Sequence, residues 1–212
     1  MADKPILFSA PMVRALLAGT KTQTRRLLKK PKWADSGSDF ELEADGPYIV
    51  AAATGCTAKV PLRIAAGDRL WVKENFAIAP TSAWALPKTV SADPDMAAYY
   101  RADFDRSGKP RWKPSIHMPR WASRIALLVT EVRVQRLQEI SDADAIAEGI
   151  HRFPSTGGPL IGFGYDPKGT PGYRVRDTAS EAYGQLIDHL HGDGTWSANP
   201  WVAAYTFTVE RR

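Results

Sequence analysis

Residues 123–137 are the strongest strand signal in this sequence of 212 residues. β-Branched and other apolar residues alternate there with Glu131, Arg133 and Gln135. A period of two places one set of side chains on each face of a strand. The segment has room for either one long bent strand or two, and we expect a sheet to form around it.

Shorter segments on both sides of it have similar character. We expect strands at residues 6–8, 48–50, 59–62, 69–73, 97–101 and 201–209. Gly67-Asp68 is a turn signal. The alternation that follows puts Leu70 and Val72 on one face of a strand, and Arg69, Trp71 and Lys73 on the other.

Capping residues predict three helices. The first begins at Ser9-Ala10-Pro11, has Met12, Leu16 and Leu17 on its apolar face, and ends at Gly19. The second begins at Ser141, where Asp144 takes the place of the usual Glu of a capping box, and ends at Gly149. The third begins after Asp177 or Thr178, and its apolar face consists of Ala182, Tyr183, Leu186, Ile187 and Leu190.

Three stretches lack such periodicity. We expect loops at residues 34–47 and at residues 152–176, which are rich in Gly and Pro, and a loop insertion at residues 79–95. Many strands with about three helices predict an α+β fold, a mixed β-barrel with peripheral helices. The length suits a single domain over residues 1–212 that carries these insertions.

The charge of the chain is unevenly distributed. The formal net charge is +5, and residues 21–32 and 109–124 hold six and five Lys or Arg with no acid. This distribution suggests an anionic partner such as a nucleotide or nucleic acid. Cys56 is the single cysteine, so no internal disulfide can form. Because residues 1–5 lack a signal-peptide core and no apolar run approaches membrane-spanning length, we expect a cytoplasmic protein without membrane contact.

Lys21, Thr24 and Arg26 lie within six residues, directly after the first predicted helix. A lysine beside a hydroxyl can activate a nucleophile, and a guanidinium can hold an anion or a base edge. The alternative is a solvated basic loop. Glu148 lies in the last turn of the second helix, where a carboxylate opposes the helix dipole, and such local violations are typical of functional sites.

Residues 111–121 interleave cations with Trp112 and Trp121. Bases stacked on indoles and phosphates bound by cations would explain this pattern, whereas the alternative has both Trp residues sealing the barrel end. The candidate nucleic-acid-binding residues are Arg25, Lys29, Lys30, Arg111, Trp112, Lys113 and Arg120. The four His and one Cys show no spacing typical of zinc ligands, so no metal is expected.

Gly19-x-Lys21-x-x-Thr24-x-Arg26 resembles the signature of the ASCH superfamily, whose barrel is PUA-like. Thr24 replaces the family's usual Glu, as in the branch of small bacterial N4-acetylcytidine amidohydrolases. Gly67–Val72 and Ala147-Glu148-Gly149 are similar to further family segments, and residues 114–121 resemble ASCH proteins of phages and prophages.

The resemblance implies a hydrolase that removes acyl groups from N4-acylated cytosine or cytidine, without a cofactor. It implies three catalytic residues: Thr24 as nucleophile, Lys21 as base or oxyanion clamp, and Glu148 as proton donor to the leaving nitrogen. We expect the substrate site to be bounded by Arg26, Trp71, Lys73 and Glu74. Its partner would be a modified nucleoside or nucleobase. The alternative is an RNA-binding or ribonucleolytic ASCH domain; the oligomeric state is left open.

Overall fold

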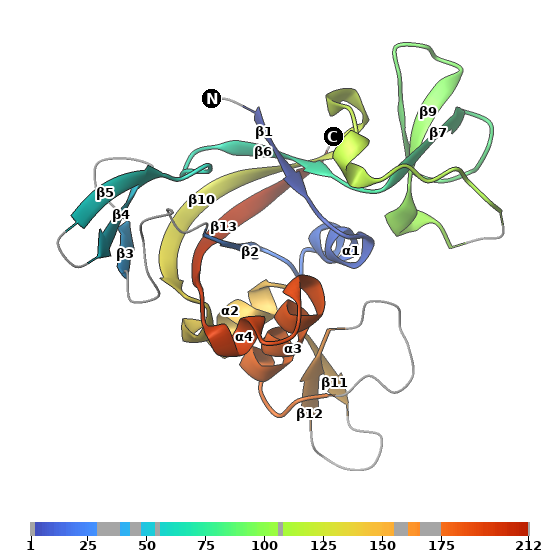
Figure 1. Cartoon of the computed structure of the whole chain (residues 1–212). Coiled ribbons are helices and arrows are strands. Elements are labelled where there is room, and N and C mark those ends of the chain that lie inside the picture. Colours follow the sequence, from blue (N-terminus) through green and yellow to red (C-terminus); the bar gives the residue numbers. More distant parts are fainter. Residues whose placement is uncertain are drawn as a thin grey trace. The chain divides into compact units, whose positions relative to one another are not determined.

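Strands make up most of the regular structure in the computed structural model of this chain (Figure 1). The structure describes residues 3–28, 39–42, 48–53, 56–105, 108–154, 161–165 and 175–211. Sheets predominate, and a few helices are interspersed among the strands. The predicted α+β class is therefore confirmed.

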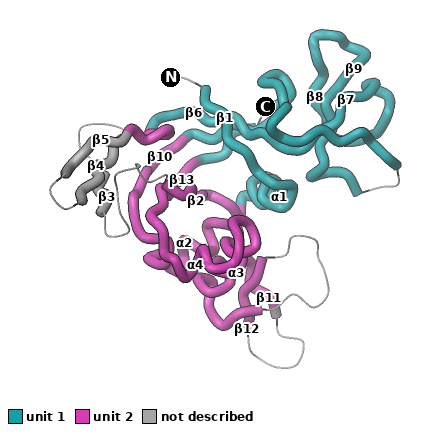
Figure 2. The backbone as a smooth tube through the Cα atoms, viewed as in Figure 1, with its two compact units in different colours: residues 1–19, 67–128, 208–212 teal, residues 20–66, 129–207 magenta. Residues whose placement is uncertain are grey.

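The chain divides into two compact units (Figure 2). Unit 1 comprises residues 1–19, 67–128 and 208–212, and unit 2 comprises residues 20–66 and 129–207. Two long strands, β10 (Ile125–Arg136) and β13 (Trp201–Arg211), contribute residues to both units. The strongest strand signal of the sequence thus forms one continuous strand, β10, and not two.

In the part of unit 1 that the structure describes there are five further strands, one α-helix and three 3-10 helices. They are β1 (Asp3–Leu7), α1 (Ala10–Ala18), β6 (Arg69–Lys73), β7 (Phe76–Pro80), β8 (Lys88–Val90), β9 (Met96–Tyr100), η1 (Arg101–Asp103), η2 (Ser115–His117) and η3 (Arg120–Ala122). β1 runs parallel to β6, and β6 pairs antiparallel with the first residues of β10. A second sheet has the order β7-β9-β8.

The predicted alternation of β6 is confirmed. Leu70 and Val72 are buried at 0% and 1% exposure, whereas Arg69, Trp71 and Lys73 are partly exposed. β6 therefore supplies two core residues from one face and presents the other three side chains on the opposite face.

Gly19 ends α1 as predicted. Its φ of 75° lies in the left-handed region, and its backbone N–H bonds to the carbonyl of Leu16 at 3.1 Å. Glycine adopts this conformation without the steric cost of a Cβ. The chain thereby turns out of α1 directly into the segment that carries Lys21.

Among its described residues, unit 2 contains six further strands, one 3-10 helix and three α-helices. They are β2 (Gln23–Leu27), β3 (Asp39–Leu42), β4 (Tyr48–Ala53), β5 (Cys56–Pro61), η4 (Leu137–Glu139), α2 (Asp142–Ala147), β11 (His151–Pro154), β12 (Ile161–Gly164), α3 (Ala179–His191) and α4 (Thr195–Ala198). β2 pairs antiparallel with β13, and β3, β4 and β5 form an antiparallel sheet. Figure 1 shows α2, α3 and α4 side by side.

One buried core cluster of unit 2 forms between the inner face of α3 and the residues around α2. Its members are Leu137, Ile140, Ala145, Ile150, Tyr165, Ala179, Ala182, Tyr183, Leu186, Ile187 and Val202. Four of the five predicted core residues of α3 belong to it. Leu190 does not, because it lies at the end of the helix and is 43% exposed.

Several predicted loops contain strands. Residues 34–47 include β3, the insertion at 79–95 includes β8, and residues 152–176 include most of the hairpin of β11 and β12. These strands have only three or four residues each. No clear periodic pattern in the sequence marks them. The second helix is also shorter than predicted, ending at Ala147 with Glu148 as its C-cap.

The largest sheet has the strand order β1-β6-β10-β13-β2. Within the residues that the structure describes, no barrel is closed, so the PUA-like architecture stays a prediction. The single-domain organisation likewise stays a prediction beside the two units.

Candidate active site

Strand β2 divides the basic motif between its two faces. β2 pairs with β13 so that Thr24 lies opposite Tyr205, and Arg25 lies opposite Ala204. Because side chains alternate along a strand, Thr24 and Arg26 share one face, and Gln23 and Arg25 share the other. The contacts agree: Arg26 Nη1 donates to Thr24 Oγ1 at 2.7 Å, and Arg25 Nη1 donates to Gln23 Oε1 at 2.6 Å.

Lys21 lies just before β2 and is anchored to α2 by the backbone. The N–H of its neighbour Thr22 donates to the carbonyl of Ala147 at 2.9 Å. This brings Lys21 to the C-terminal end of α2, where Lys21 Nζ donates to the backbone carbonyl and to Oε2 of Glu148, both at 2.7 Å. The ammonium thus lies at the negative end of the helix dipole and beside a carboxylate.

The Lys21–Glu148 ion pair is almost completely removed from water. The two side chains are 1% and 4% exposed. Burial lowers the pKa of the Lys21 amine below its ordinary value, the charge of Glu148 opposes this effect, and Arg26 and Arg25 add to it. A buried amine with a depressed pKa is the state that a lysine base requires.

Glu148 has further partners on its other oxygen. Arg25 Nη1 contacts Glu148 Oε1 at 3.3 Å, and the hydroxyl of Tyr183 lies 3.5 Å from the same oxygen. Burial raises the pKa of the Tyr183 hydroxyl well above its ordinary value, and Glu148 adds to this rise. Tyr183 is therefore neutral at physiological pH and can donate to the carboxylate.

Arg25 also binds a second carboxylate, that of Asp144 in the first turn of α2. Its Nη2 donates to Asp144 Oδ2 at 2.9 Å, and Arg133 of β10 binds the same carboxylate at 3.0 and 3.1 Å. The Arg25 side chain is 1% exposed, so it offers no surface group for the nucleic-acid contact expected of it. Sequence reasoning missed Asp144, Arg133 and Tyr183 as parts of this network.

The only local signal for Asp144 was its position in the capping box of α2. The structure shows that Ser141 caps the helix, accepting from the N–H of Asp144 at 3.1 Å. The Asp144 carboxylate is thereby left to bind the arginines of β2 and β10. No local pattern identifies those partners, which are 119 and 11 residues away.

Trp71, Lys73 and Glu74 belong to unit 1, and their expected position beside Lys21 stays a prediction. Glu74 is 1% exposed and accepts from Arg124 at 2.8 and 3.0 Å. Burial raises the pKa of Glu74, although Arg124 opposes the shift. Both oxygens of Glu74 are therefore engaged within unit 1.

Two cations lie near the Trp71 ring. Lys73 Nζ lies 5.2 Å and Arg120 Cζ 5.6 Å from its centroid, distances at which cations are attracted to an indole. Lys73 Nζ also donates to the carbonyl of Ile116 at 2.5 Å, and Arg120 Nε donates to Asp3 at 3.0 Å.

The remaining basic candidates differ in exposure. Arg111 and Lys113 are exposed, and the partly buried Trp112 packs edge-on against Phe104 with Arg101 5.6 Å from its ring. Lys29 and Lys30 lie outside the described residues, as does the neighbouring Lys32.

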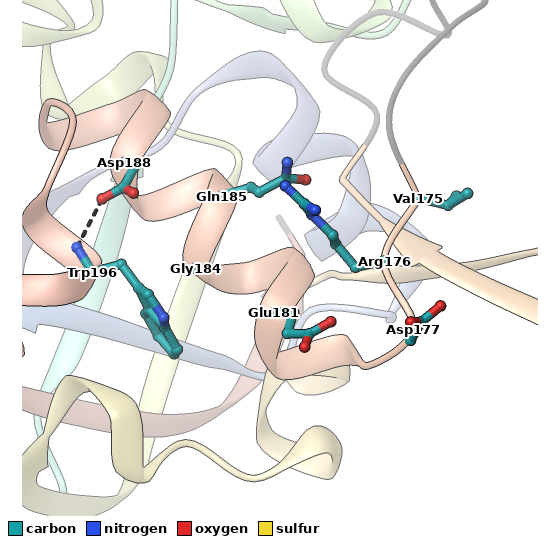
Figure 3. A pocket seen from close by; sticks show the side chains of 8 residues that line it. All are labelled: Val175, Arg176, Asp177, Glu181, Gly184, Gln185, Asp188 and Trp196. Atoms are coloured by element: carbon teal, nitrogen blue, oxygen red, sulfur yellow. Dashed lines mark hydrogen bonds between the residues drawn. The ribbon is translucent and has the colours of Figure 1, made fainter.

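A separate pocket of about 510 Å³ lies on α3 (Figure 3). None of the predicted site residues lines it. α3 forms its floor, Trp196 stands on one side, and residues 175–177 stand on the other. Gly184 makes this arrangement possible, because a Cβ there would lie 2.8 Å from Trp196 Cδ2. A glycine inside a helix is a sequence signal for such close packing, and sequence reasoning did not use it.

Among the residues that the structure describes, no group of three or more His, Cys, Asp or Glu could hold a metal ion. No helix in the described ranges is long and apolar enough to cross a bilayer.

Comparisons with protein families, curated proteins and solved structures found no match to this chain.

Proposed function

We propose that this protein is an amidohydrolase that removes acyl groups from N4-acylated cytosine or cytidine in the cytoplasm, with Thr24 and Lys21 at its centre. The observation that supports it most is the buried ion pair in which Glu148 holds Lys21 at 2.7 Å. Thr24, three residues further along the sequence, is also buried at 1% exposure. The acyl-cytosine substrate, like the PUA-like barrel, follows from the motif resemblance and not from this geometry.

In the proposed reaction, Thr24 Oγ attacks the acyl carbonyl carbon, and its proton passes to the neutral amine of Lys21. The tetrahedral intermediate then collapses, and the Lys21 ammonium returns that proton to the departing N4 of cytosine. Water hydrolyses the resulting threonine ester and restores the hydroxyl. Lysine needs a depressed pKa for this role, which burial supports.

Arg26 supports the nucleophile in this scheme. Its guanidinium donates to Thr24 Oγ1 at 2.7 Å and so stabilises negative charge that develops on this oxygen. Arg26 is also the least buried of the three motif side chains, since Lys21 and Thr24 are each 1% exposed. We therefore place the substrate entry beside Arg26.

Glu148 is better supported as the partner that holds Lys21 than as a proton donor to the substrate. Its carboxylate binds Lys21 and also Arg25, whose side chain leaves β2 on the face opposite Thr24. Two cations on one carboxylate favour its ionised form. In this position it fixes the direction of the amine and stabilises the ammonium that forms when Lys21 takes the proton of Thr24.

The proposal is tested by incubating the purified protein with N4-acetylcytidine and measuring cytidine and acetate by chromatography. Thr24→Ala should abolish turnover, and Thr22→Ala is the matched control, because Thr22 is exposed and two residues away. If the rate constant rises with pH through the pKa of Lys21, the lysine is the base. If it falls, the lysine is an oxyanion clamp. Turnover by Thr24→Ala at the wild-type rate would refute the nucleophile.

Nucleic-acid binding by unit 1 is a second candidate function, favoured by the exposed side chains of residues 111–121. Trp121 is 38% exposed, Ile116 is 63% exposed, and Arg111 and Lys113 are exposed beside them in sequence. Bases stack on exposed indoles, and phosphates bind cations. RNA is the proposed partner for this surface.

Fluorescence anisotropy with labelled single-stranded RNA tests this candidate. Trp121→Ala should cost about 1–3 kcal/mol of binding free energy if the indole stacks on a base. Replacing Arg111 and Lys113 with Gln should flatten the salt dependence by the equivalent of about two phosphate contacts. Lys88→Gln, an exposed change elsewhere in unit 1, is the control. No binding to RNA at low salt would exclude this function.

A further inference from the structure

Five charged side chains of unit 2 form an alternating chain of cations and anions. Arg133 Nη2 binds Asp144 at 3.0 Å, Asp144 binds Arg25 Nη2 at 2.9 Å, Arg25 Nη1 contacts Glu148 at 3.3 Å, and Glu148 binds Lys21 Nζ at 2.7 Å. Side-chain exposure falls from 37% at Arg133 to 1% at Lys21. The chain thus connects a partly exposed charge with the buried amine.

The Asp144 carboxylate accepts hydrogen bonds from three side chains. It accepts from Gln23 Nε2 at 3.2 Å, from Arg25 Nη2, and twice from Arg133 Nη2. Partial burial opposes ionisation of its carboxyl, but Arg133 and Arg25 overcome this effect and lower its pKa. Asp144 is therefore a fixed negative charge at physiological pH.

Arg25 is shared between two carboxylates. One terminal nitrogen binds Asp144 at 2.9 Å, and the other contacts Glu148 at the longer distance of 3.3 Å. Loss of the Asp144 charge would leave Glu148 as the stronger attraction for the guanidinium. A carboxylate neutralised by Arg25 holds an ammonium less tightly, so Lys21 would release its proton more readily.

We propose that Asp144 is a positioning residue for Lys21: by holding Arg25, it leaves one oxygen of Glu148 to the amine. The effect on turnover rests on the proposed amidohydrolase function, whereas the effect on the protonation of Lys21 does not. The charged and titratable groups that surround the chain are Arg25 and Arg26 of β2, Glu131 and Arg133 of β10, Asp144 and Glu148 of α2, Tyr183 of α3 and Tyr205 of β13.

Carbon-13 NMR tests this directly in the intact protein labelled at the lysine ε-carbons. The Lys21 resonance is assigned as the one that disappears in Lys21→Met. Asp144→Asn should lower the titration midpoint of Lys21 by about one pH unit, the scale on which the loss of one nearby charge shifts a pKa.

The matched control is Asp142→Asn, which removes the same charge two residues away on the same helix. The Asp142 carboxylate accepts from the N–H of Ser180, a bond that Asn can keep. It should move the Lys21 midpoint by less than half as much. Equal shifts in the two variants, or no shift in Asp144→Asn, would overturn the proposal.

Arg133→Gln is an independent variant that should shift the Lys21 midpoint in the opposite direction. Because the Arg133 side chain is 37% exposed, this change does not remove a buried group. Without Arg133, Asp144 binds Arg25 more fully, so the Lys21 midpoint should rise. A fall of the Lys21 midpoint in Arg133→Gln would overturn the proposal. This test remains available if Asp144→Asn does not fold. Asp144→Glu, which restores the charge, should return the midpoint toward that of the unmodified protein.

Kinetics distinguish this inference from the proposed function. If the protein deacylates N4-acetylcytidine, the acid limb of its kcat/KM profile should move with the NMR midpoint in Asp144→Asn. An inactive wild-type protein would remove the proposed function, while the NMR result would still decide the role of Asp144.

Discussion

Breaking the Lys21–Glu148 pair should destabilise unit 2 in an asymmetric way. Glu148→Gln leaves the Lys21 ammonium at 1% exposure beside a neutral amide, and removing one partner of a buried ion pair costs about 3–5 kcal/mol. Lys21→Met leaves Glu148 with Arg25 at 3.3 Å and with Tyr183 at 3.5 Å. Its cost should therefore be smaller, about 1–3 kcal/mol.

The double variant Lys21→Met/Glu148→Gln should be less destabilised than the sum of the two changes by about 2 kcal/mol, because each single change leaves a buried charge that the other removes. The assay is urea unfolding followed by circular dichroism at pH 7, with the free energy of unfolding compared among the four proteins. Additivity within about 0.5 kcal/mol would show that the two side chains do not interact in solution and would refute this reasoning.

The pH dependence of the free energy of unfolding gives an independent check of the direction in which Glu148 shifts the Lys21 pKa. Glu148 opposes the lowering of the Lys21 pKa, so Glu148→Gln should lower it further. Between this lowered value and the ordinary 10.5, the unfolded chain binds more protons than the folded one, so stability rises with pH in that window. The destabilisation by Glu148→Gln relative to the wild type should thus be smaller at pH 9.5 than at pH 7. A larger penalty at pH 9.5 would contradict the assignment.

Three further changes test local features by urea unfolding. Gly19→Ala should cost about 1 kcal/mol, because its φ of 75° disfavours a Cβ even though the space around it is open. Gly184→Ala should cost about 1–3 kcal/mol and alter tryptophan fluorescence, because its Cβ would meet Trp196 at 2.8 Å; a gain in stability would show that helix propensity outweighs this clash. Thr178→Ala should cost about 1 kcal/mol through loss of the cap to the Glu181 N–H, and Thr178→Ser should not.

Local chemistry allowed much of the secondary structure to be predicted. The caps at Ser141 and Thr178 use side-chain oxygens that bond to an N–H three residues ahead, which a sequence pattern can indicate. The alternation in β6 predicts its buried face for the same reason, since it depends only on neighbours along the strand. Such features need no knowledge of tertiary contacts.

The missed elements depend on contacts that no local sequence pattern indicates. β11 and β12 have four residues each and form a hairpin in a segment rich in Gly and Pro, where no periodicity precedes the pairing. Asp144 is a capping-box residue in the sequence but binds Arg25 and Arg133 in the structure. An ion pair between β2 and α2 has no signature in either segment alone.

The placement of Arg25 shows why charge density in a sequence is a weak guide to a binding surface. Arg25 and Arg26 are adjacent in a basic run, yet the alternation of β2 sends one guanidinium to two carboxylates and the other to a threonine hydroxyl. Burying a charge is costly unless partners compensate for it, and Arg25 has Asp144 and Glu148 in that role. A basic run that enters a strand is therefore better interpreted one face at a time. On β2, one face carries Arg25, which binds Asp144 and the Glu148 carboxylate that holds Lys21. The other face carries the hydroxyl that we propose as the nucleophile.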